Sequence, residues 1–375
     1  MASLTASTRP AARRHIGRHA ACTWRTFTAP VTPRFQRTAE DAADELMKEF
    51  GGRIVSRRQL IDGNQLQKLA LTLGRRHLSS DGGVGYEEHA IDKMLDVTDS
   101  PPPPGTLVPP GYHLVYFTPG GLETELGMDG TDETFNAPSP FNRRMWAGGV
   151  MRWPGSADGQ SSNSTQLRVG DEAEERTRLV SATRKKSRSA GEMILVELEK
   201  EFWTARGLAL VDRRSWVFRP ALDASRSVEP PPARIERGTR APSRVRDIDQ
   251  DGDGFPRREL CWSSVGLFRF SALTFNGHKI HLSEDWARNV EGHAGLVVHG
   301  PLNLISILDY WRDVHGRGRA TPGQISYRAA APVYAGETYH VVTRETRPGV
   351  DVGGQEWLVD VDKNGITCMS GVVGR

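Results

Sequence analysis

Two neighbouring stretches organise this chain of 375 residues: FRFSALTFNGHKIH at residues 268–281 and GLVVHGPL at residues 295–302. The first stretch begins as an apolar, strand-like run and turns polar at Asn276, and two histidines follow within six residues of the run's end. The second stretch is apolar and ends in His-Gly-Pro, directly before a pattern typical of a helix. Groups that can exchange protons therefore gather beside the start of a helix.

The order of residues in these stretches resembles the MaoC-like dehydratases and (R)-specific enoyl-CoA hydratases. Their signature reads Gly-Asp-x-Asn-Pro-Ile-His, followed later by an apolar run and His-Gly. Asn276 stands where that family usually has its catalytic Asp, and His278 stands at the Asn, while Ile280 and His281 match directly. The runs FNxHKIH and VVHGPL are most similar to the branch that holds hydroxyacyl-thioester dehydratase type 2 and bacterial mesaconyl-C4-CoA hydratase-like proteins.

The overall composition is that of a globular protein large enough for two domains, with 37% hydrophobic and 25% charged residues. No run approaches the ~18 apolar residues of a membrane span. The three cysteines, Cys22, Cys261 and Cys368, are odd in number and far apart. This spacing argues against a disulfide framework or a CxxC metal site and favours a reducing compartment.

The first forty residues have a composition of their own. They carry seven arginines, and the first acidic residue is Glu40. We predict a mitochondrial transit peptide at residues 1–38 and a matrix location, with a basic tail as the alternative. Removing the seven arginines changes the formal charge from +3 to −4, so the basicity belongs to this segment and a nucleic-acid partner is not expected.

Residue periodicity places the expected elements. It predicts helices at residues 39–50, 60–73 and 301–314. It predicts strands at 112–117, 175–183, 193–203, 208–218, 325–330, 338–345, 356–361 and 366–373. Residues 220–258 are rich in Pro, Arg, Ser and Asp, which indicates a linker or a long insertion.

The two halves of the chain echo each other. ALTL at residues 70–73 matches ALTF at 272–275, and VGD at 169–171 matches YAGE at 334–337. We read this as an internal repeat. The first copy lacks the Ile-His pair, the His-Gly-Pro helix start and an obvious long central helix.

The repeat sets the predicted domain organisation. We expect a degenerate N-terminal domain at residues 39–219 and a catalytic C-terminal domain at 259–375, with a single active site. Composition and periodicity alone support only an α+β class with antiparallel sheet. The family resemblance implies a tandem hot-dog fold, in which antiparallel sheets each wrap a helix, as a monomeric pseudo-dimer or a homodimer.

Reversible dehydration of a 3-hydroxyacyl thioester needs a base for the α-proton, an acid for the leaving hydroxyl and an electrophile for the thioester oxygen. The resemblance makes His281 the main acid/base candidate, with His278 as the second. Asn276 cannot transfer protons but can orient a water or hydroxyl. Gly300 is the candidate oxyanion donor, because its N–H is unpaired at a helix start. The alternatives are histidines that bond backbone groups and a tight turn before a helix.

Other residues are candidates for substrate binding. His299 and Phe275 flank the catalytic residues, and Trp146 belongs either to the site or to the core. The basic cluster of Lys185, Lys186 and Arg188 could contact the phosphates of coenzyme A or the acidic surface of an acyl carrier protein. The alternative for that cluster is a solvated face.

Metal and redox cofactors are not expected. The pair His278-x-x-His281 lacks a third ligand at motif spacing. The acidic run at residues 247–253 resembles a calcium loop, but Leu260 occupies the twelfth position, where a bidentate Glu is needed.

The resemblance implies reversible dehydration of (3R)-hydroxyacyl thioesters to trans-2-enoyl thioesters in mitochondrial type II fatty acid synthesis, with acyl carrier protein as the carrier. One alternative is a hydratase of short dicarboxylic acyl-CoA esters such as mesaconyl-C4-CoA. Another is an inactive thioester-binding or scaffold protein, because Asn276 replaces the usual Asp. The sequence leaves open the acyl-chain length, the carrier and the second proton carrier.

We expect residues 1–45, fused to a fluorescent protein, to direct import into mitochondria, because the segment is rich in Arg and free of acidic residues up to Glu40. Fluorescence microscopy with a mitochondrial marker checks this. A fusion that stays in the cytosol contradicts the targeting prediction.

Overall fold

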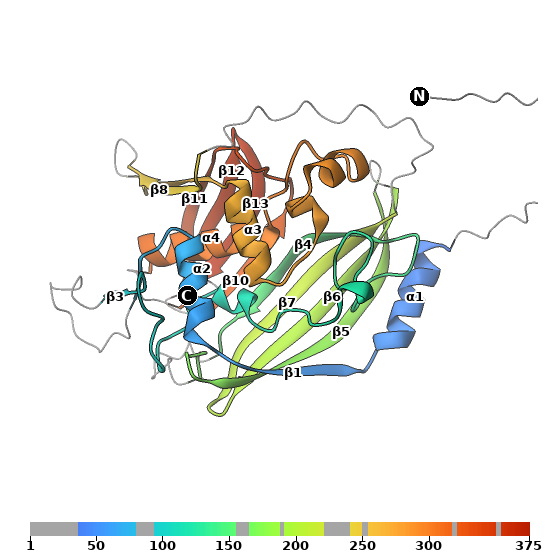
Figure 1. The fold of residues 1–375 in the computed structure, drawn as a ribbon, viewed down its shortest axis with the longest axis horizontal. Coiled ribbons are helices and arrows are strands. Elements are labelled where there is room, and N and C mark those ends of the chain that lie inside the picture. The colour runs from blue at the N-terminus through green and yellow to red at the C-terminus, as the bar shows by residue number, and fades with distance from the viewer. Residues whose placement is uncertain are drawn as a thin grey trace, which may run out of the picture. The chain divides into compact units, whose positions relative to one another are not determined.

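The computed structural model describes residues 37–79, 94–154, 165–187, 191–220, 241–249, 254–316, 321–349 and 354–375. All but the last two residues of the predicted transit peptide lie outside the described residues. Eleven strands form one antiparallel sheet in the order β1-β5-β6-β7-β4-β10-β13-β12-β11-β9-β8. Figure 1 shows α4 lying across the strands of the C-terminal half, with α2 and α3 side by side.

The described residues of the N-terminal half form two helices, five strands of the main sheet, a small two-stranded sheet and two short 3₁₀ turns. They are α1 (Ala39–Phe50), β1 (Ile54–Leu60), α2 (Gly63–Thr72), β2 (His77–Ser79), β3 (Met94–Asp96), η2 (Tyr112–Val115), η3 (Glu123–Glu125), β4 (Arg143–Arg152), β5 (Glu172–Ser187), β6 (Gly191–Thr204) and β7 (Gly207–Arg219).

In the C-terminal half, the part of the chain that the structure describes forms six strands, two α-helices and two single-turn segments. They are β8 (Arg244–Ile248), β9 (Arg257–Cys261), α3 (Ser264–Leu273), η4 (Lys279–His281), the π-helical turn η5 (Trp286–Val290), α4 (Gly300–Val314), β10 (Gln324–Ala329), β11 (Tyr339–Pro348), β12 (Gln355–Lys363) and β13 (Ile366–Gly374).

Both halves have the same strand order. The strands compared are β1, β4, β5, β6 and β7 in the first half and β9 to β13 in the second. From the outer edge of the sheet to its centre, each half places its first strand, then its third, fourth and fifth, and last its second strand. Strand β8 is added outside β9. The fold is the tandem hot-dog fold that the resemblance implied. The halves join where β4 pairs with β10, so the two predicted sheets are one continuous sheet. This pairing satisfies the backbone groups of two strands that would otherwise be exposed edges.

The repeated motifs occupy equivalent positions. The N–H of Gly170 donates to Ile61 O at 2.8 Å, and that of Gly336 donates to Trp262 O at 2.9 Å. Each glycine has a positive φ and precedes a long strand, β5 or β11. Each carbonyl acceptor belongs to the residue just before the N-cap of a helix, Asp62 for α2 and Ser263 for α3. The same turn is therefore built twice, which supports an internal duplication.

Two predicted strands are helical in the structure. The apolar run around residues 268–273 belongs to α3, because Ser263 caps the helix by accepting a hydrogen bond from Gly266 N and the apolar side chains are buried at helical spacing. Residues 112–117 contain a 3₁₀ turn, where Tyr112 is fully buried and its hydroxyl donates to Asp309. Tertiary packing decides both conformations.

The predicted linker at residues 220–258 also contains a strand. Its described part includes β8, which pairs with β9 and extends the edge of the sheet. Residues 221–240 and 250–253, which include Asp251 and Asp253 of the acidic run that resembles a calcium loop, lie outside the described residues. Asp247 of that run forms a salt bridge with Arg258, so its carboxylate is already engaged.

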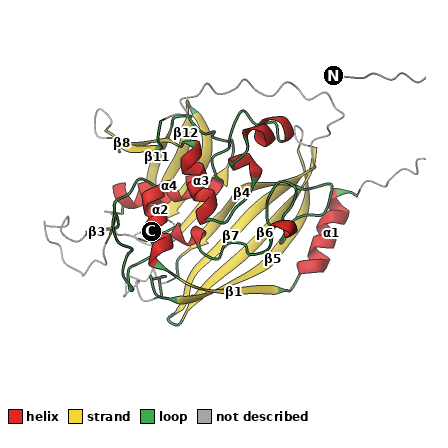
Figure 2. Ribbon diagram, in the orientation of Figure 1, coloured by secondary structure: helices red, strands yellow, loops and turns green. Residues whose placement is uncertain are grey.

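The halves differ in what covers the sheet. In the C-terminal half, α4 begins with Pro at its first turn and buries the run from Leu302 to Arg312, whose apolar side chains belong to the main core. In the N-terminal half, the described residues between α2 and β4 hold no helix longer than four residues. In Figure 2 the long strands β5, β6 and β7 extend between the central group of helices and α1. A cavity lies over this half of the sheet.

Candidate active site

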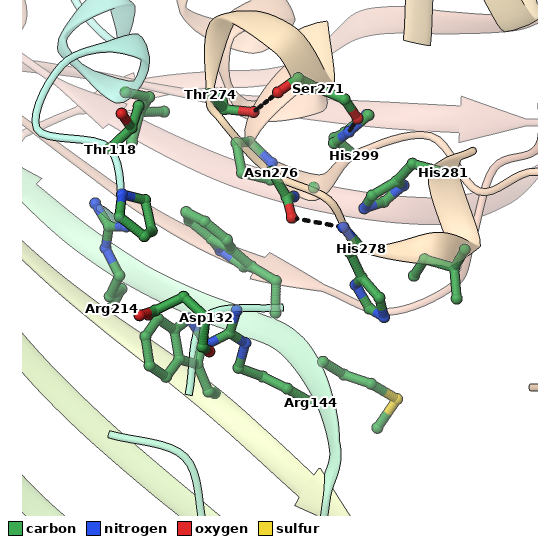
Figure 3. Close-up of a pocket in the computed structure, with 18 of the residues that line it drawn as sticks. Thr118, Asp132, Arg144, Arg214, Ser271, Thr274, Asn276, His278, His281 and His299 are labelled. Carbon is green, nitrogen blue, oxygen red and sulfur yellow. Dashed lines mark hydrogen bonds between the residues drawn. The ribbon is translucent and has the colours of Figure 1, made fainter. Parts of the chain in front are cut away.

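The cavity has a volume of about 870 Å³ and is lined by both halves of the chain. One wall comes from β4 to β7 and the loop at residues 113–135. The other comes from the end of α3, the segment that follows it and the start of α4. Figure 3 shows side chains of the two walls facing each other. The first half is thus part of the site, although it lacks the signature.

His281 is buried and held in one tautomer. Its Nδ1 lies 2.7 Å from the carbonyl oxygen of Val297, which can only accept, so the proton is on Nδ1 and Nε2 keeps a free lone pair. Burial, reinforced by His278, lowers the pKa of His281 to about 3, against a hydrogen bond to Val297 that raises it. The imidazole is therefore a neutral base at physiological pH.

The imidazole of His299 packs against the imidazole of His281. The two rings stack with centroids 3.6 Å apart and planes 19° apart. Its Nε2 lies 2.9 Å from the hydroxyl of Ser271, and its Nδ1 has no hydrogen-bond partner in the described chain. His299 is only 1% exposed. The sequence predicted that it contacts the substrate, whereas in the structure its ring packs on His281, the acid/base candidate.

Asn276 and Phe275 lie at the turn after α3. The side-chain oxygen of Asn276 accepts a hydrogen bond from the backbone N–H of His278 at 3.0 Å, drawn as a dashed line in Figure 3. Its amide NH₂ is the remaining donor for a ligand. Phe275 has a φ of 48° and is 67% exposed in the cavity wall. The turn thus orients His278 and exposes an aromatic ring.

Gly300 opens α4 at the cavity wall. No side chain caps this helix, and within the described residues the N–H of Gly300 donates to no partner. The indole of Trp146 covers the glycine, since an added Cβ would lie 3.4 Å from it. The arrangement leaves a backbone donor at the positive end of the helix dipole, as an oxyanion site requires.

His278 faces charged groups from the N-terminal half. Its Nε2 lies 3.6 Å from a carboxylate oxygen of Asp129. Burial, together with the charges of Arg144 and His293, lowers the pKa of His278 to about 3. The sequence analysis missed Asp129; only the Gly-rich turn around it, GMDG at 127–130, signalled a fixed backbone.

Arg144 reaches the cavity from β4. Its guanidinium donates to Asp132 O at 3.1 Å and to Asn136 Oδ1 at 3.0 Å, and it lies over the Trp216 ring at 4.7 Å. Among the described residues no carboxylate forms a salt bridge with it. Burial lowers the pKa of this arginine, which the carboxylates of Asp132 and Asp129 partly offset. Figure 3 shows it opposite Asn276 and His278.

Two other cations of this wall, Lys200 and Arg214, are each paired with a carboxylate. Lys200 donates to Glu175 at 2.9 Å, and Arg214 donates to Asp212, which also faces His113 at 3.6 Å. Burial lowers the pKa of Lys200 and is opposed by Glu175. These two pairs cancel in charge. Among the described residues of this wall, Arg144 and Arg219 are left as cations without a carboxylate in salt-bridge distance.

The basic cluster lies elsewhere. Lys185 and Lys186 are exposed at the end of β5 and do not line the cavity. Arg188 lies outside the described residues. Contact of this cluster with coenzyme A or an acyl carrier protein stays a prediction.

In the described part of the chain, no group of three or more His, Cys, Asp or Glu side chains could hold a metal ion. No helix of that part is long and apolar enough to cross a membrane.

With this geometry in view, the family can be assigned. The profile described as hydroxyacyl-thioester dehydratase type 2 matches residues 111–335, more than half of the chain. The chain belongs to this family. It is therefore a hydro-lyase, a hydratase or dehydratase of acyl thioesters. The matched region includes β4, the loop that carries Asp129 and both sequence stretches at 268–281 and 295–302.

Two relatives of known name are similar over most of the chain. Mesaconyl-C(4)-CoA hydratase of Chloroflexus aurantiacus is 28% identical over 288 residues, which cover 76% of this chain and 91% of the relative. The mitochondrial hydroxyacyl-thioester dehydratase type 2 of Schizosaccharomyces pombe is 25% identical over 253 residues, which cover 64% and 79%.

Solved structures agree in fold. A MaoC-like dehydratase superposes with a TM-score of 0.56 at 13% identity, covering 88% of this chain and 98% of the other. The MaoC-like dehydratase of Phytophthora capsici superposes with a TM-score of 0.53 at 14% identity, covering 88% and 97%. At these identities the likeness supports the tandem hot-dog fold and nothing finer.

We expect the free energy of unfolding to decrease as pH falls from about 6.5 toward 3. In this window the unfolded chain binds protons at His278 and His281, whose pKa values of about 3 keep them neutral in the folded state. Each histidine should contribute a slope of up to about 1.4 kcal/mol per pH unit. Urea unfolding at several pH values checks this. Equal stability at neutral pH and at about pH 5 contradicts it.

Proposed function

We propose that this family member interconverts (3R)-hydroxyacyl and trans-2-enoyl thioesters in type II fatty acid synthesis of the mitochondrial matrix. The observation that carries the chemistry is the placement of a neutral His281, with Nε2 free, in the same cavity as the unpaired N–H of Gly300. One group can move a proton and the other can stabilise the thioester oxygen.

The proposed reaction uses both groups. In the dehydration direction His281 Nε2 takes the C2 proton, and the electron pair of the C–H bond moves toward the thioester oxygen. The N–H of Gly300 stabilises the resulting enolate oxygen. The C3–O bond then breaks as the C2–C3 double bond forms, and the hydroxyl leaves as water after it gains a proton. His278 is the candidate to pass the proton that His281 has taken on to this hydroxyl, so that both imidazoles end neutral. The amide of Asn276 is the candidate to orient the hydroxyl.

The cellular setting rests on two supports. The first forty residues are rich in arginine, and the Schizosaccharomyces pombe relative is named as mitochondrial. An acyl carrier protein is the proposed carrier, and the exposed Lys185 and Lys186 with Arg188 are the proposed contact for its acidic surface. Coenzyme A is the alternative carrier.

A second candidate function is hydration of a short dicarboxylic acyl-CoA ester. Arg144 favours it, because this cation borders the cavity and has no salt-bridge partner among the described residues. A substrate carboxylate would supply the missing partner, and Arg binds carboxylates in a bidentate fashion. The Chloroflexus aurantiacus relative is named for such a substrate.

We expect His281→Ala to lower kcat on a 3-hydroxyacyl-CoA by about 10²–10⁴-fold, the usual contribution of a positioned acid/base group. His77→Ala is the control, because that histidine is 49% exposed on β2, outside the cavity. Steady-state kinetics on folded variants check both. Near wild-type turnover by His281→Ala contradicts the proposed function.

We expect Arg144→Gln to separate the two candidate substrates. If Arg144 binds a distal carboxylate, kcat/KM for mesaconyl-C4-CoA should fall by about 10–100-fold more than kcat/KM for crotonyl-CoA, since a hydrogen bond to a charged group contributes about 1.5–3 kcal/mol. Arg152→Gln, an exposed arginine on the same strand, is the control. Equal losses on both substrates contradict the carboxylate role and favour the monocarboxylic acyl chain.

A further inference from the structure

The N-terminal half delivers a carboxylate to the catalytic stretch through a fixed loop. The turn at residues 127–130 lies against the segment that follows Asn276. The N–H of Lys279 donates to Asp129 O at 2.8 Å, and the ammonium of Lys279 donates to Met128 O at 2.6 Å. Two backbone carbonyls of the loop thus bind one residue beside His278.

Two glycines permit this close approach. An added Cβ on Gly130 would lie 2.3 Å from the carbonyl oxygen of Gly277, and one on Gly277 would lie 2.9 Å from Gly130 O. Gly130 also has a φ of +82°, which side chains rarely adopt. The two backbones meet without side chains between them, so the position of Asp129 relative to His278 is set by the main chain.

The carboxylate of Asp129 is oriented as well as placed. Its Oδ1 accepts hydrogen bonds from the N–H of Thr131 at 2.9 Å and from the hydroxyl of Thr131 at 2.8 Å. Its Oδ2 lies 3.6 Å from His278 Nε2, and the two side chains are only 13% and 10% exposed. Such contacts often lengthen in ligand-free sites and tighten when substrate binds.

We propose that Asp129 is a positioning residue that holds the proton of His278 on Nε2 and thereby makes this imidazole the second proton carrier. The inference rests on the proposed hydro-lyase function. A carboxylate beside Nε2 favours N–H there and leaves the lone pair on Nδ1. Asp129 thus supplies the negative charge that Asn276 cannot, from the half of the chain that lacks the signature.

Neighbouring groups oppose protonation of His278, and the carboxylate of Asp129 must offset their effect. Arg144 and His293 both face this imidazole and lower its pKa, and the ring of His281 lies 5.4 Å away between centroids. These groups oppose a positive charge on His278. Among the described residues, Asp129 is the carboxylate within salt-bridge distance of His278, so it stabilises the imidazolium that forms when His278 takes up a proton.

The resulting relay balances in protons and electrons. In the hydration direction His278 Nδ1 takes a proton from water while the oxygen bonds to C3 and the C2–C3 π electrons move to the thioester oxygen. The proton then passes to Nε2 of His281 and from there to C2, where the enolate electron pair forms the new C–H bond. Both histidines end neutral, and one water has been added across the double bond.

The test is Asp129→Asn, which keeps an oxygen acceptor for Thr131 and removes the charge. We expect kcat for hydration of crotonyl-CoA to fall by about 10–100-fold, the loss typical of a group that orients a catalytic imidazole, with KM changed by less than about twofold. Glu133→Gln, an exposed carboxylate of the same loop, is the matched control with unchanged kcat.

A second readout does not depend on turnover. Long-range ¹H–¹⁵N spectra of His278 should show the Nε2–H tautomer in the wild type and a changed tautomer balance in Asp129→Asn. A kcat within about twofold of wild type, or an Nδ1–H tautomer in the wild type, overturns the role of Asp129. If the wild type hydrates no enoyl thioester but shows the expected tautomers, the proposed function fails and the positioning role stands.

Discussion

The pairing of β4 with β10 is the constraint on which the rest of this structure depends. It joins two hot-dog halves into one sheet and fixes β4 beside the start of α4. The indole of Trp146 on β4 then packs on Gly300, and Arg144 on the same strand reaches the cavity. Without this pairing, each half would expose an edge strand and the site would lose a wall.

The two halves have diverged in what they place over the sheet. The C-terminal half covers its strands with α4, whose burial forms the main core and whose first residue offers a free backbone donor. In the N-terminal half, the described residues of the equivalent region form loops and short 3₁₀ turns, and the cavity of about 870 Å³ lies there. Among the described residues, the first copy places no long helix over its strands, and this leaves space for a substrate. The strands and loops of the same copy bring charged side chains to that space.

The three buried histidines of the site have different supports. His281 is fixed by a backbone carbonyl, His299 by the hydroxyl of Ser271, and His278 by the turn that Asn276 caps. Burial lowers the pKa of all three, so the site holds neutral imidazoles whose tautomers are set by their partners. Replacement of the family's Asp by Asn276 is compatible with proton transfer in such a site, because a carboxylate can be supplied from elsewhere in the chain.

The sequence by itself determined the family, the central helix at residues 301–314 and the strands of both meanders, because each depends on neighbouring residues. It also singled out His281 as the acid/base candidate, which stays a prediction. It misread residues 268–273 as a strand, since a short apolar run has no clear period and its helical state depends on the Ser263 cap and on packing. Only the tertiary structure brought Asp129 and Arg144 to His278, across a long separation in the chain. A local pattern cannot encode that proximity, because it arises from the pairing of β4 with β10 and from the contact between Gly130 and Gly277.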